Sequence, residues 1–313
     1  MEFLNGIEFI ESKPEDVIDH LKNVKREVIT VPPDQLYIYF ENEKPYLSVN
    51  SRGQLNFQVR KAFLHKLLRW CKFPVSQLLK LSPETLCSLL NDCLLLIKSP
   101  VVNIKLEDGE ALTITGNRYS EITDLFILEH LNGLNVEKIT RTDFFMRIYS
   151  EISQKIEILE GDEFGFGINI VNSETGFKAL SVHNYILRYI CNNGAVAKIG
   201  QVEKLYHYAH HRDFLEFSIT RGIKQFHANK ERIIDSIQNS VNSKLDDNFD
   251  VIKKQLTSLM GSKQSKTIME ELDPNSNLFT LFNHLTNRAK EFDSDKRLQI
   301  EELAGNMVTN KLT

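Results

Sequence analysis

The sequence has few cysteines, no long hydrophobic run and no basic N-terminal leader. Its four cysteines show no C-x-x-C spacing, so we predict reduced thiols rather than a disulfide framework. The most hydrophobic segment, residues 86–97, is interrupted by Asn91 and Asp92 and is too short to cross a bilayer. A signal peptide is not indicated either. We therefore predict a cytoplasmic protein with no membrane partner.

The sequence also lacks the motifs of common catalytic sites. In Phe164-Gly165-Phe166-Gly167 the glycines alternate with aromatic residues, and no Gly-Lys-Ser/Thr follows, which argues against a phosphate-binding loop. Ser173 lies outside any G-x-S-x-G context. Without a nucleotide or dinucleotide motif, we predict no cofactor and no catalytic residue, and hence a non-catalytic protein.

The composition is that of a globular protein with a sizeable core. Hydrophobic residues make up 42% and charged residues 26% of the 313 positions, which is enough to bury one large or two medium domains. The net charge of −4 gives no overall attraction to nucleic acid or anionic lipid. Affinity for either must therefore come from a local basic patch.

Hydrophobic periodicity and turn residues predict an α+β fold. We expect a mixed or antiparallel sheet domain with packed helices over residues 1–228, and a helical C-terminal segment over 229–313. The predicted strands are 27–31, 36–40, 45–49, 101–106, 111–115, 139–149, 155–159 and 164–170. The predicted helices are 14–23, 58–73, 83–97, 120–131, 229–260, 275–292 and 295–309. Residues 199–226 indicate helix interrupted at Gly200 and Gly222.

Residues 164–194 form the most ordered pattern in the sequence. A strand over 164–170 is followed by the turn residues 172–176, in which Gly176 suits a positive φ. A second strand or a short helix then follows, and the 3–4 spacing of Tyr185, Ile186, Tyr189 and Ile190 suits a helix. We expect this turn to have a structural role.

The long helix predicted over 229–260 carries an apolar seam. Apolar residues recur there at steps of three and four, a spacing that puts them on one face. Such a seam must pack either on the chain's own core or on a second copy. We predict a homo-oligomer formed through the C-terminal helices.

Two stretches resemble the phage/plasmid-like proteins, a family found in prophages, plasmids and other mobile elements. The first contains Asn172-Ser173-x-x-Gly176, Ala179-Leu180-x-Val182 and Arg188-x-x-Cys191-x-Asn193-Gly194. The second contains Leu278-Phe279-x-x-Phe282-Asn283-x-Leu285-Thr286, Arg297-Leu298 and Ala304-Gly305. The resemblance implies a mobile-element context and DNA metabolism, and it brings no established catalytic residues.

A basic helix over 58–73 is the clearest electrostatic feature. Arg60, Lys61, Lys66, Arg69 and Lys72 stand there with no acidic residue among them. Lys61, Arg69 and Lys72 share a stripe with His65, opposite an apolar stripe that ends at Trp70. The basic stripe suits a line of phosphates, although a solvated face paired with the acidic N-terminal segment would give the same pattern.

A second basic region, 186–232, interleaves cations with aromatic residues. Its candidate contacts are Arg188, Lys204, Arg212, Arg221 and Lys224. Phosphates need positive charge and unstacked bases need ring faces, so this mixture suits a single strand. Alternatively, the aromatic residues belong to the core and the charges to the surface.

Four residues in the second basic region have the types that bind metals. On a helix, Glu203 and His207 would share a face with His210 or His211, as a transition metal requires. No H-E-x-x-H motif and no distant ligand accompany them, so we predict no metal.

These features favour a non-catalytic nucleic-acid-binding protein of a mobile element. Single-stranded DNA is the predicted partner, and a recombination or annealing accessory is the predicted role. One alternative is a metal-dependent nucleic-acid hydrolase that uses the histidine cluster. The other is an interaction factor that acts on a host defence or replication protein.

Overall fold

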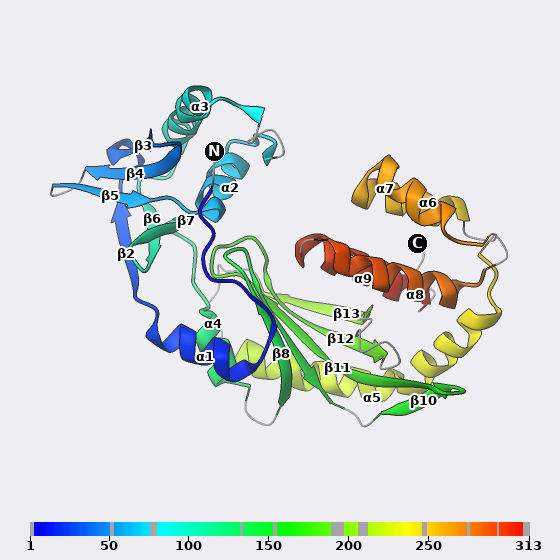
Figure 1. Cartoon of the computed structure of the whole chain (residues 1–313). Coiled ribbons are helices and arrows are strands. Elements are labelled where there is room, and N and C mark those ends of the chain that lie inside the picture. The colour runs from blue at the N-terminus through cyan, green and yellow to red at the C-terminus, as the bar shows by residue number, and fades with distance from the viewer. Residues whose placement is uncertain are drawn as a thin grey trace. The chain divides into compact units, whose positions relative to one another are not determined.

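A computed structural model of the chain shows an α+β fold (Figure 1). It describes residues 3–50, 53–75, 80–131, 134–152, 155–188, 197–205, 212–245, 249–273, 276–292 and 294–308, without the side chains of 188, 197–205, 212–216, 226, 294 and 295. The chain divides into two compact units. Unit 1 comprises residues 1–148, 171–181 and 204–212, and unit 2 comprises 149–170, 182–203 and 213–313.

The elements up to residue 141 belong to unit 1. Its helices are α1 (Pro14–Asn23), α2 (Lys61–Trp70), α3 (Pro83–Leu95), α4 (Asp124–Glu129) and the short η1 (Pro33–Gln35). Its strands are β1 (Phe9–Ser12), β2 (Arg26–Val31), β3 (Leu36–Glu41), β4 (Lys44–Asn50), β5 (Gln54–Gln58), β6 (Val102–Glu107), β7 (Glu110–Gly116) and β8 (Asn135–Arg141). Two antiparallel three-stranded sheets have the orders β2-β6-β7 and β3-β4-β5.

Local sequence signals explain several of these elements. The Ser82 side chain accepts a hydrogen bond from the Thr85 backbone N–H and caps α3, as Ser before Pro predicts. Asp108 and Gly109 form the turn between β6 and β7. One face of α2 packs into an apolar core with α3 and the two small sheets. The helices predicted over 14–23 and 83–97 and the strands predicted over 101–106 and 111–115 are confirmed to within two residues.

The elements that follow β8 are four strands and a set of helices. The strands are β9 (Met146–Glu151), β10 (Ile156–Leu159), β11 (Asp162–Asn172), β12 (Leu180–Arg188) and β13 (Ala197–Leu205). The helices are α5 (Arg212–Asn242), α6 (Phe249–Met260), α7 (Ser262–Glu270), α8 (Leu278–Arg288), α9 (Ser294–Val308) and the short η4 (Ala289–Glu291). A seven-stranded sheet has the order β1-β8-β9-β11-β12-β13, with β10 beside β11.

The apolar seam of the C-terminal helices is buried within unit 2. Ile237, Leu245, Ile252 and Leu256 lie in a core that also contains Phe164 of β11. The seam therefore packs on the chain's own core, the first of the two alternatives. Its burial removes the reason for expecting self-association through this face.

Several sequence predictions differ from the structure. The strand predicted over 139–149 is two strands, β8 and β9. Of the strand or short helix left open after residue 176, the strand is observed over 180–188, because pairing in a sheet overrides helical spacing of apolar residues. The helix predicted over 229–260 is divided between α5 and α6, and α5 runs without interruption through Gly222 and residue 228. Residues 262–270, which lie between two of the predicted helices, form α7, whose Ile268 and Met269 are buried while its lysines face solvent.

Cys71, Cys87 and Cys93 carry unbridged thiols. Within the described ranges, no helix is long and apolar enough to cross a bilayer.

Candidate nucleic-acid interface

Helix α2 presents a basic side away from the core of unit 1. Phe63 and Leu67 are fully buried on the apolar stripe, as predicted, and Val59, which precedes the helix, is fully buried as well. Away from that stripe, Arg69 is exposed and Lys61 is half-buried, and Lys72 is exposed two residues beyond the last residue of α2. These three cations form no ion pair with any other residue that the structure describes. The expected pairing with the acidic N-terminal segment is thus not seen for them.

The basic side of α2 contacts the turn that follows β11. The Lys66 ammonium donates a 2.7 Å hydrogen bond to the Gly176 carbonyl oxygen. The Arg69 guanidinium lies 4.7 Å from the centre of the Phe177 ring, a cation–π distance. Phe144 packs edge-on against Phe177, with ring centres 5.0 Å apart. We call the outward side of α2 together with residues 176–178 the α2 surface.

Hydrogen bonds fix the shape of this turn. The Gly176 backbone N–H donates to the Ser173 carbonyl, and the Phe177 N–H donates to the Ser173 hydroxyl oxygen. That hydroxyl donates in turn to the Phe144 carbonyl at 2.6 Å. Gly176 has φ of +74°, which L side chains rarely adopt. The predicted structural role of Gly176 is supported by this geometry.

Glycine is also required at position 176 because other side chains come close. A Cβ there would lie 2.7 Å from Lys66 Nζ and 3.1 Å from the ring of Tyr119. The Tyr119 hydroxyl donates to the Ser173 carbonyl at 2.8 Å. The segment after β7 therefore reaches the same turn as α2, so three separate stretches of sequence meet at Gly176.

Burial lowers the pKa of two residues in α2. Burial, and secondly the Arg69 charge, lower the pKa of Lys66 to about 8. Burial, with Lys61 and Arg69 beside it, lowers the pKa of His65 to about 4. At neutral pH the basic stripe therefore carries its charge on lysine and arginine, while His65 is a neutral ring that packs against Phe144 at 5.2 Å.

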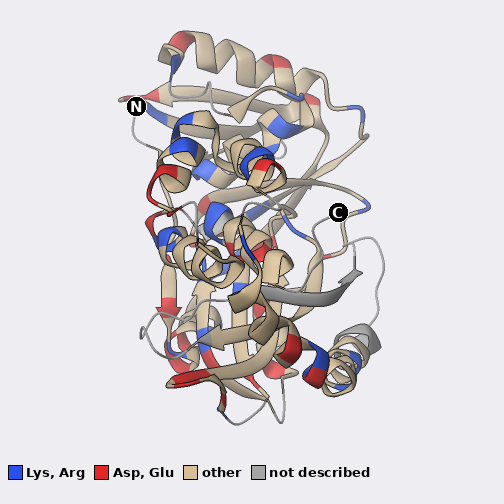
Figure 2. Cartoon of the chain, turned by 90° about the vertical axis from the view of Figure 1, so that its right-hand side faces the viewer, with Lys and Arg blue, Asp and Glu red and all other residues tan. Residues whose placement is uncertain are grey.

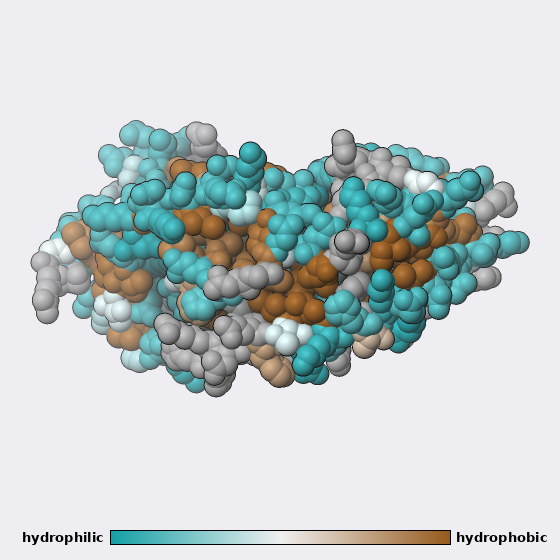
Figure 3. Space-filling view, turned by 90° about the horizontal axis from the view of Figure 1, so that it is seen from below, coloured by the Kyte–Doolittle hydropathy of each residue, from teal (hydrophilic) through white to brown (hydrophobic). Residues whose placement is uncertain are grey.

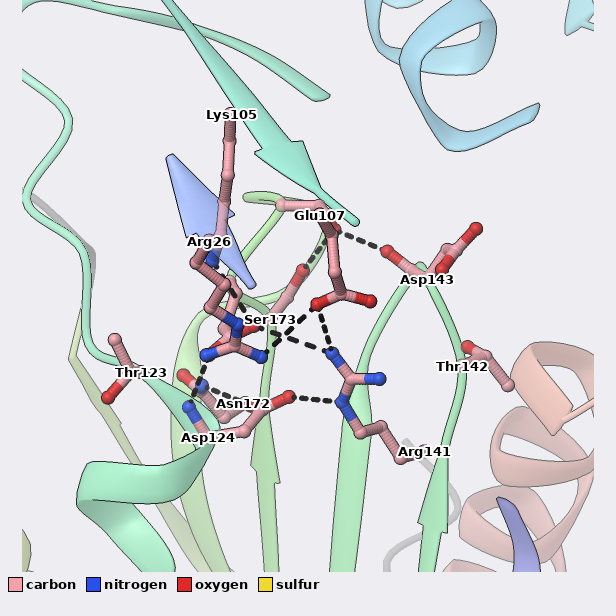
Figure 4. A network of polar contacts seen from close by, with 12 residues as sticks. Arg26, Lys105, Glu107, Thr123, Asp124, Arg141, Thr142, Asp143, Asn172 and Ser173 are labelled. Carbon is pink, nitrogen blue, oxygen red and sulfur yellow. Dashed lines mark hydrogen bonds and ion pairs between the residues drawn. The ribbon is translucent and has the colours of Figure 1, made fainter. Parts of the chain in front are cut away.

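A buried ion-pair network lies inside unit 1 and includes the start of the same turn (Figure 4). Arg141 is its centre: its Nη2 lies 3.1 Å from Glu107 and 3.7 Å from Glu174, and its Nε lies 3.2 Å from Asp124. Arg26 also pairs with Glu107 and Glu174, at 3.3 and 2.9 Å. Strands β2, β6 and β8, helix α4 and the turn are thereby joined through their charged side chains.

The network shifts the pKa values of its carboxyl groups in opposite directions. Burial would raise the pKa of Glu107, but Arg141, Arg60 and Arg26 outweigh it and lower that pKa to about 2. Burial, and then the neighbouring Glu174 charge, raise the pKa of Asp124. Glu107, Asp124 and Arg141 are each less than 4% exposed. Such a network holds elements together and offers no surface to a ligand.

Arg60 belongs to this internal network, so its predicted role as a phosphate contact is not supported. It is 4% exposed and pairs with Glu107 and Asp143 at 3.0 Å and with Glu110 at 2.7 Å. Helix α2 begins at Lys61, so Arg60 precedes the helix and does not follow its stripes. The Thr175 hydroxyl donates to the Asp143 carbonyl, and Asp143 thus connects Arg60 to the turn.

The second predicted region is described only in part. Arg221 and Lys224 are exposed on α5 in unit 2, and the Arg221 guanidinium lies 6.0 Å from the centre of the exposed Phe217 ring. Arg188 and Lys204 lie in β12 and β13, and Arg212 begins α5. The side chains of these last three residues are outside the described set.

The predicted metal candidates do not share one helix. Glu203 lies in strand β13, where helical spacing does not apply, so the geometric argument for it is wrong. His207, His210 and His211 fall outside the described residues. Among the residues that are described, no group of His, Cys, Asp and Glu is arranged to hold a metal ion.

Sequence reasoning did not single out Phe177, Arg118 or the exposure of Trp70. Phe177 supports Arg69, but only the tertiary fold brings it to α2. Arg118 is exposed in the segment between Gly116 and Tyr119, and no described residue pairs with it. Trp70 was predicted on the apolar stripe, yet it is 38% exposed. An aromatic residue at the end of a basic helix was the one available signal for Trp70.

The α2 surface is a local feature. Figure 2 shows Lys and Arg interspersed with Asp and Glu along the chain. Figure 3 shows hydrophobic residues visible among hydrophilic ones on the face seen from below. The large apolar residues with substantial exposure come from several elements, including Tyr37 of β3, Leu95 of α3 and Phe217 of α5. Trp70 is distinguished from these three by having a basic residue on either side in the sequence, Arg69 and Lys72.

Comparison with protein-family models, with curated proteins and with solved structures gives no match for this chain.

Proposed function

We propose that this protein binds nucleic acid through the α2 surface, with a preference for single strands. The observation that carries the proposal is the combination of unpaired cations and aromatic rings on this surface. Arg69 lies over Phe177, while Lys61 and Lys72 extend the positive charge along α2. Phosphates are attracted by such charges, and ring faces accept unstacked bases.

Several features suit this surface to its role. Lys66 and the hydrogen-bonded turn hold Phe177 in place, so the guanidinium of Arg69 rests on a fixed ring. A preorganised contact loses less conformational entropy on binding. The exposed Arg221 and Lys224 of α5 provide a second candidate contact in unit 2. The resemblance to phage/plasmid-like proteins would suit an accessory role in recombination or annealing.

Fluorescence anisotropy of a labelled single-stranded oligonucleotide tests the proposal. Changing Lys61, Arg69 and Lys72 to Glu removes three phosphate contacts. Each phosphate contact with a single strand changes the log of the affinity by about 0.7 for a tenfold change in salt concentration. Three contacts therefore raise the affinity about a hundredfold when the salt concentration falls tenfold to about 0.1 M. We expect a loss of that size with little change in thermal stability, because Arg69 and Lys72 are exposed and neither they nor the half-buried Lys61 form an ion pair with a described residue.

A matched variant separates a local effect from net charge. Lys13, Lys22 and Lys44 are also exposed in unit 1, and changing them to Glu alters the net charge by the same amount. This control should retain most of the affinity. Equal losses in both variants would show that only overall charge matters, and an absence of binding by the unmodified protein would refute the proposed function.

A further inference from the structure

Trp70 occupies an unusual position for a residue of the apolar stripe. The other members of the stripe within the helix, Phe63 and Leu67, are fully buried, whereas Trp70 at the last position of α2 is 38% exposed. An indole ring is the largest apolar side chain, and leaving it in water is unfavourable unless something covers it. The chain thus keeps a solvent-accessible indole at the end of its basic helix.

The ring of Trp70 lies beside a glycine of a neighbouring strand. A Cβ on Gly116, the last residue of β7, would be 4.0 Å from Trp70 Cζ2, and no other heavy atom would come closer. A larger side chain at Gly116 would begin to compete with a ligand for the space next to the indole. Tyr119, three residues later, links this segment to Ser173 in the turn that carries Phe177.

Three exposed cations stand close to this indole, or to Gly116 beside it, in the sequence. Arg69 precedes it and Lys72 follows it by two residues, and Arg118 lies two residues after Gly116. All three are exposed, and none of them forms an ion pair with a described residue. A ligand that covers the ring would therefore have an anionic backbone and a flat, uncharged group.

We infer that Trp70 is the base-stacking residue of the α2 surface and that it makes the surface selective for unpaired bases. The inference rests on the proposed function. Base-to-aromatic stacking contributes about 1–3 kcal/mol per base and tolerates any base, since every base has a π face. In a duplex both faces of each base are already stacked, so Trp70 would gain nothing there.

The chain has a single tryptophan, so its indole emission reports on this residue alone. We would titrate the full-length protein with an oligothymidine strand, and separately with a duplex of equal length, while anisotropy of a labelled strand reports binding independently. We expect the single strand to quench the emission and the duplex to leave it unchanged. Trp70→Ala should lower single-strand affinity by between about fivefold and about a hundredfold, with duplex affinity unchanged.

Two further variants make the outcome specific. Trp70→Phe keeps a smaller ring and should retain part of the affinity. Tyr37→Ala removes a ring that is 56% exposed on β3 and should leave affinity as it was. Anisotropy that shows binding without quenching, or with unchanged affinity in Trp70→Ala, would overturn the stacking role and leave the proposed function standing. An absence of binding in the anisotropy assay would overturn both.

Discussion

Replacing Arg141 by Leu is the sharpest perturbation of the buried network. Arg141 is 2% exposed and lies within 3.7 Å of three carboxylates. Glu107 and Glu174 would keep Arg26 as a partner, but no other cation is paired with Asp124 among the described residues. Removing one partner from a buried ion pair costs about 3–5 kcal/mol, because the remaining carboxyl group must either keep a charge that nothing compensates or take up a proton. We expect the free energy of unfolding to fall by that amount at pH 8.

The dependence of this cost on pH identifies Asp124 as its source. Without Arg141 the Asp124 carboxyl stays protonated in the folded protein, while in the unfolded chain it ionises with a pKa near 3.9. The folded state then holds the extra proton, so the variant loses stability as pH rises. The cost of Arg141→Leu should therefore be smaller at pH 5 than at pH 8, and adding Asp124→Asn should reduce it at pH 8.

Urea denaturation followed by far-UV circular dichroism measures these differences. Lys25→Ala is the control, since Lys25 pairs with Glu27 at the surface, where both side chains are more than half exposed. It should cost less than about 1 kcal/mol. A cost below about 1 kcal/mol for Arg141→Leu, or the same cost at both pH values, would refute the network's structural role.

Three further predictions concern single residues. The pKa of Glu107 is lowered to about 2, so the stability that this carboxylate contributes above pH 4.5 should be lost as the pH falls towards 2. Glu107→Gln should flatten this part of the plot of unfolding free energy against pH. An unchanged plot would contradict the prediction. Because the pKa of Lys66 is about 8, nucleic-acid affinity should fall as the pH rises from 7 to 9, and Lys66→Arg should abolish that fall. A fall in affinity centred near pH 10 would instead indicate a lysine with an unshifted pKa. Gly176→Ala should lower the free energy of unfolding by about 1–2 kcal/mol and also weaken binding. Gly109 has a positive φ as well, but no atom lies near its added Cβ, so Gly109→Ala should lower stability alone. Equal binding by both variants would show that the turn is not part of the site.

Local signals predicted most of unit 1 from the sequence. The Ser82 cap, the Asp108-Gly109 turn and the bounds of α1 depend on residues adjacent in the chain, so they could be identified without knowing the fold. β12 and the break between α5 and α6 could not. Their apolar spacing fits a helix, and only pairing between distant strands and packing in the unit 2 core decide otherwise.

The sequence predicted the charged residues of the candidate site, but it did not predict the residues that pack against them. Helical spacing grouped Lys61 and Arg69 on α2, but it does not apply to Lys72, which lies beyond Trp70, the last residue of the helix, with φ of +57°. It could not reveal that Arg60 stands before the helix and is buried, because a shift of one residue reverses its surroundings. Phe177 is more than a hundred residues away in sequence, and its contact with Arg69 follows from the fold alone.

The salt dependence of single-strand binding tests the central claim most directly. Affinity measured by anisotropy across a series of salt concentrations should give a linear plot of log affinity against log salt concentration. Changing Lys61, Arg69 and Lys72 to Glu should flatten its slope by about two units, since three phosphate contacts at about 0.7 unit each are lost. The Lys13, Lys22 and Lys44 variant should keep the slope of the unmodified protein. An unchanged slope in the α2 variant would contradict the account.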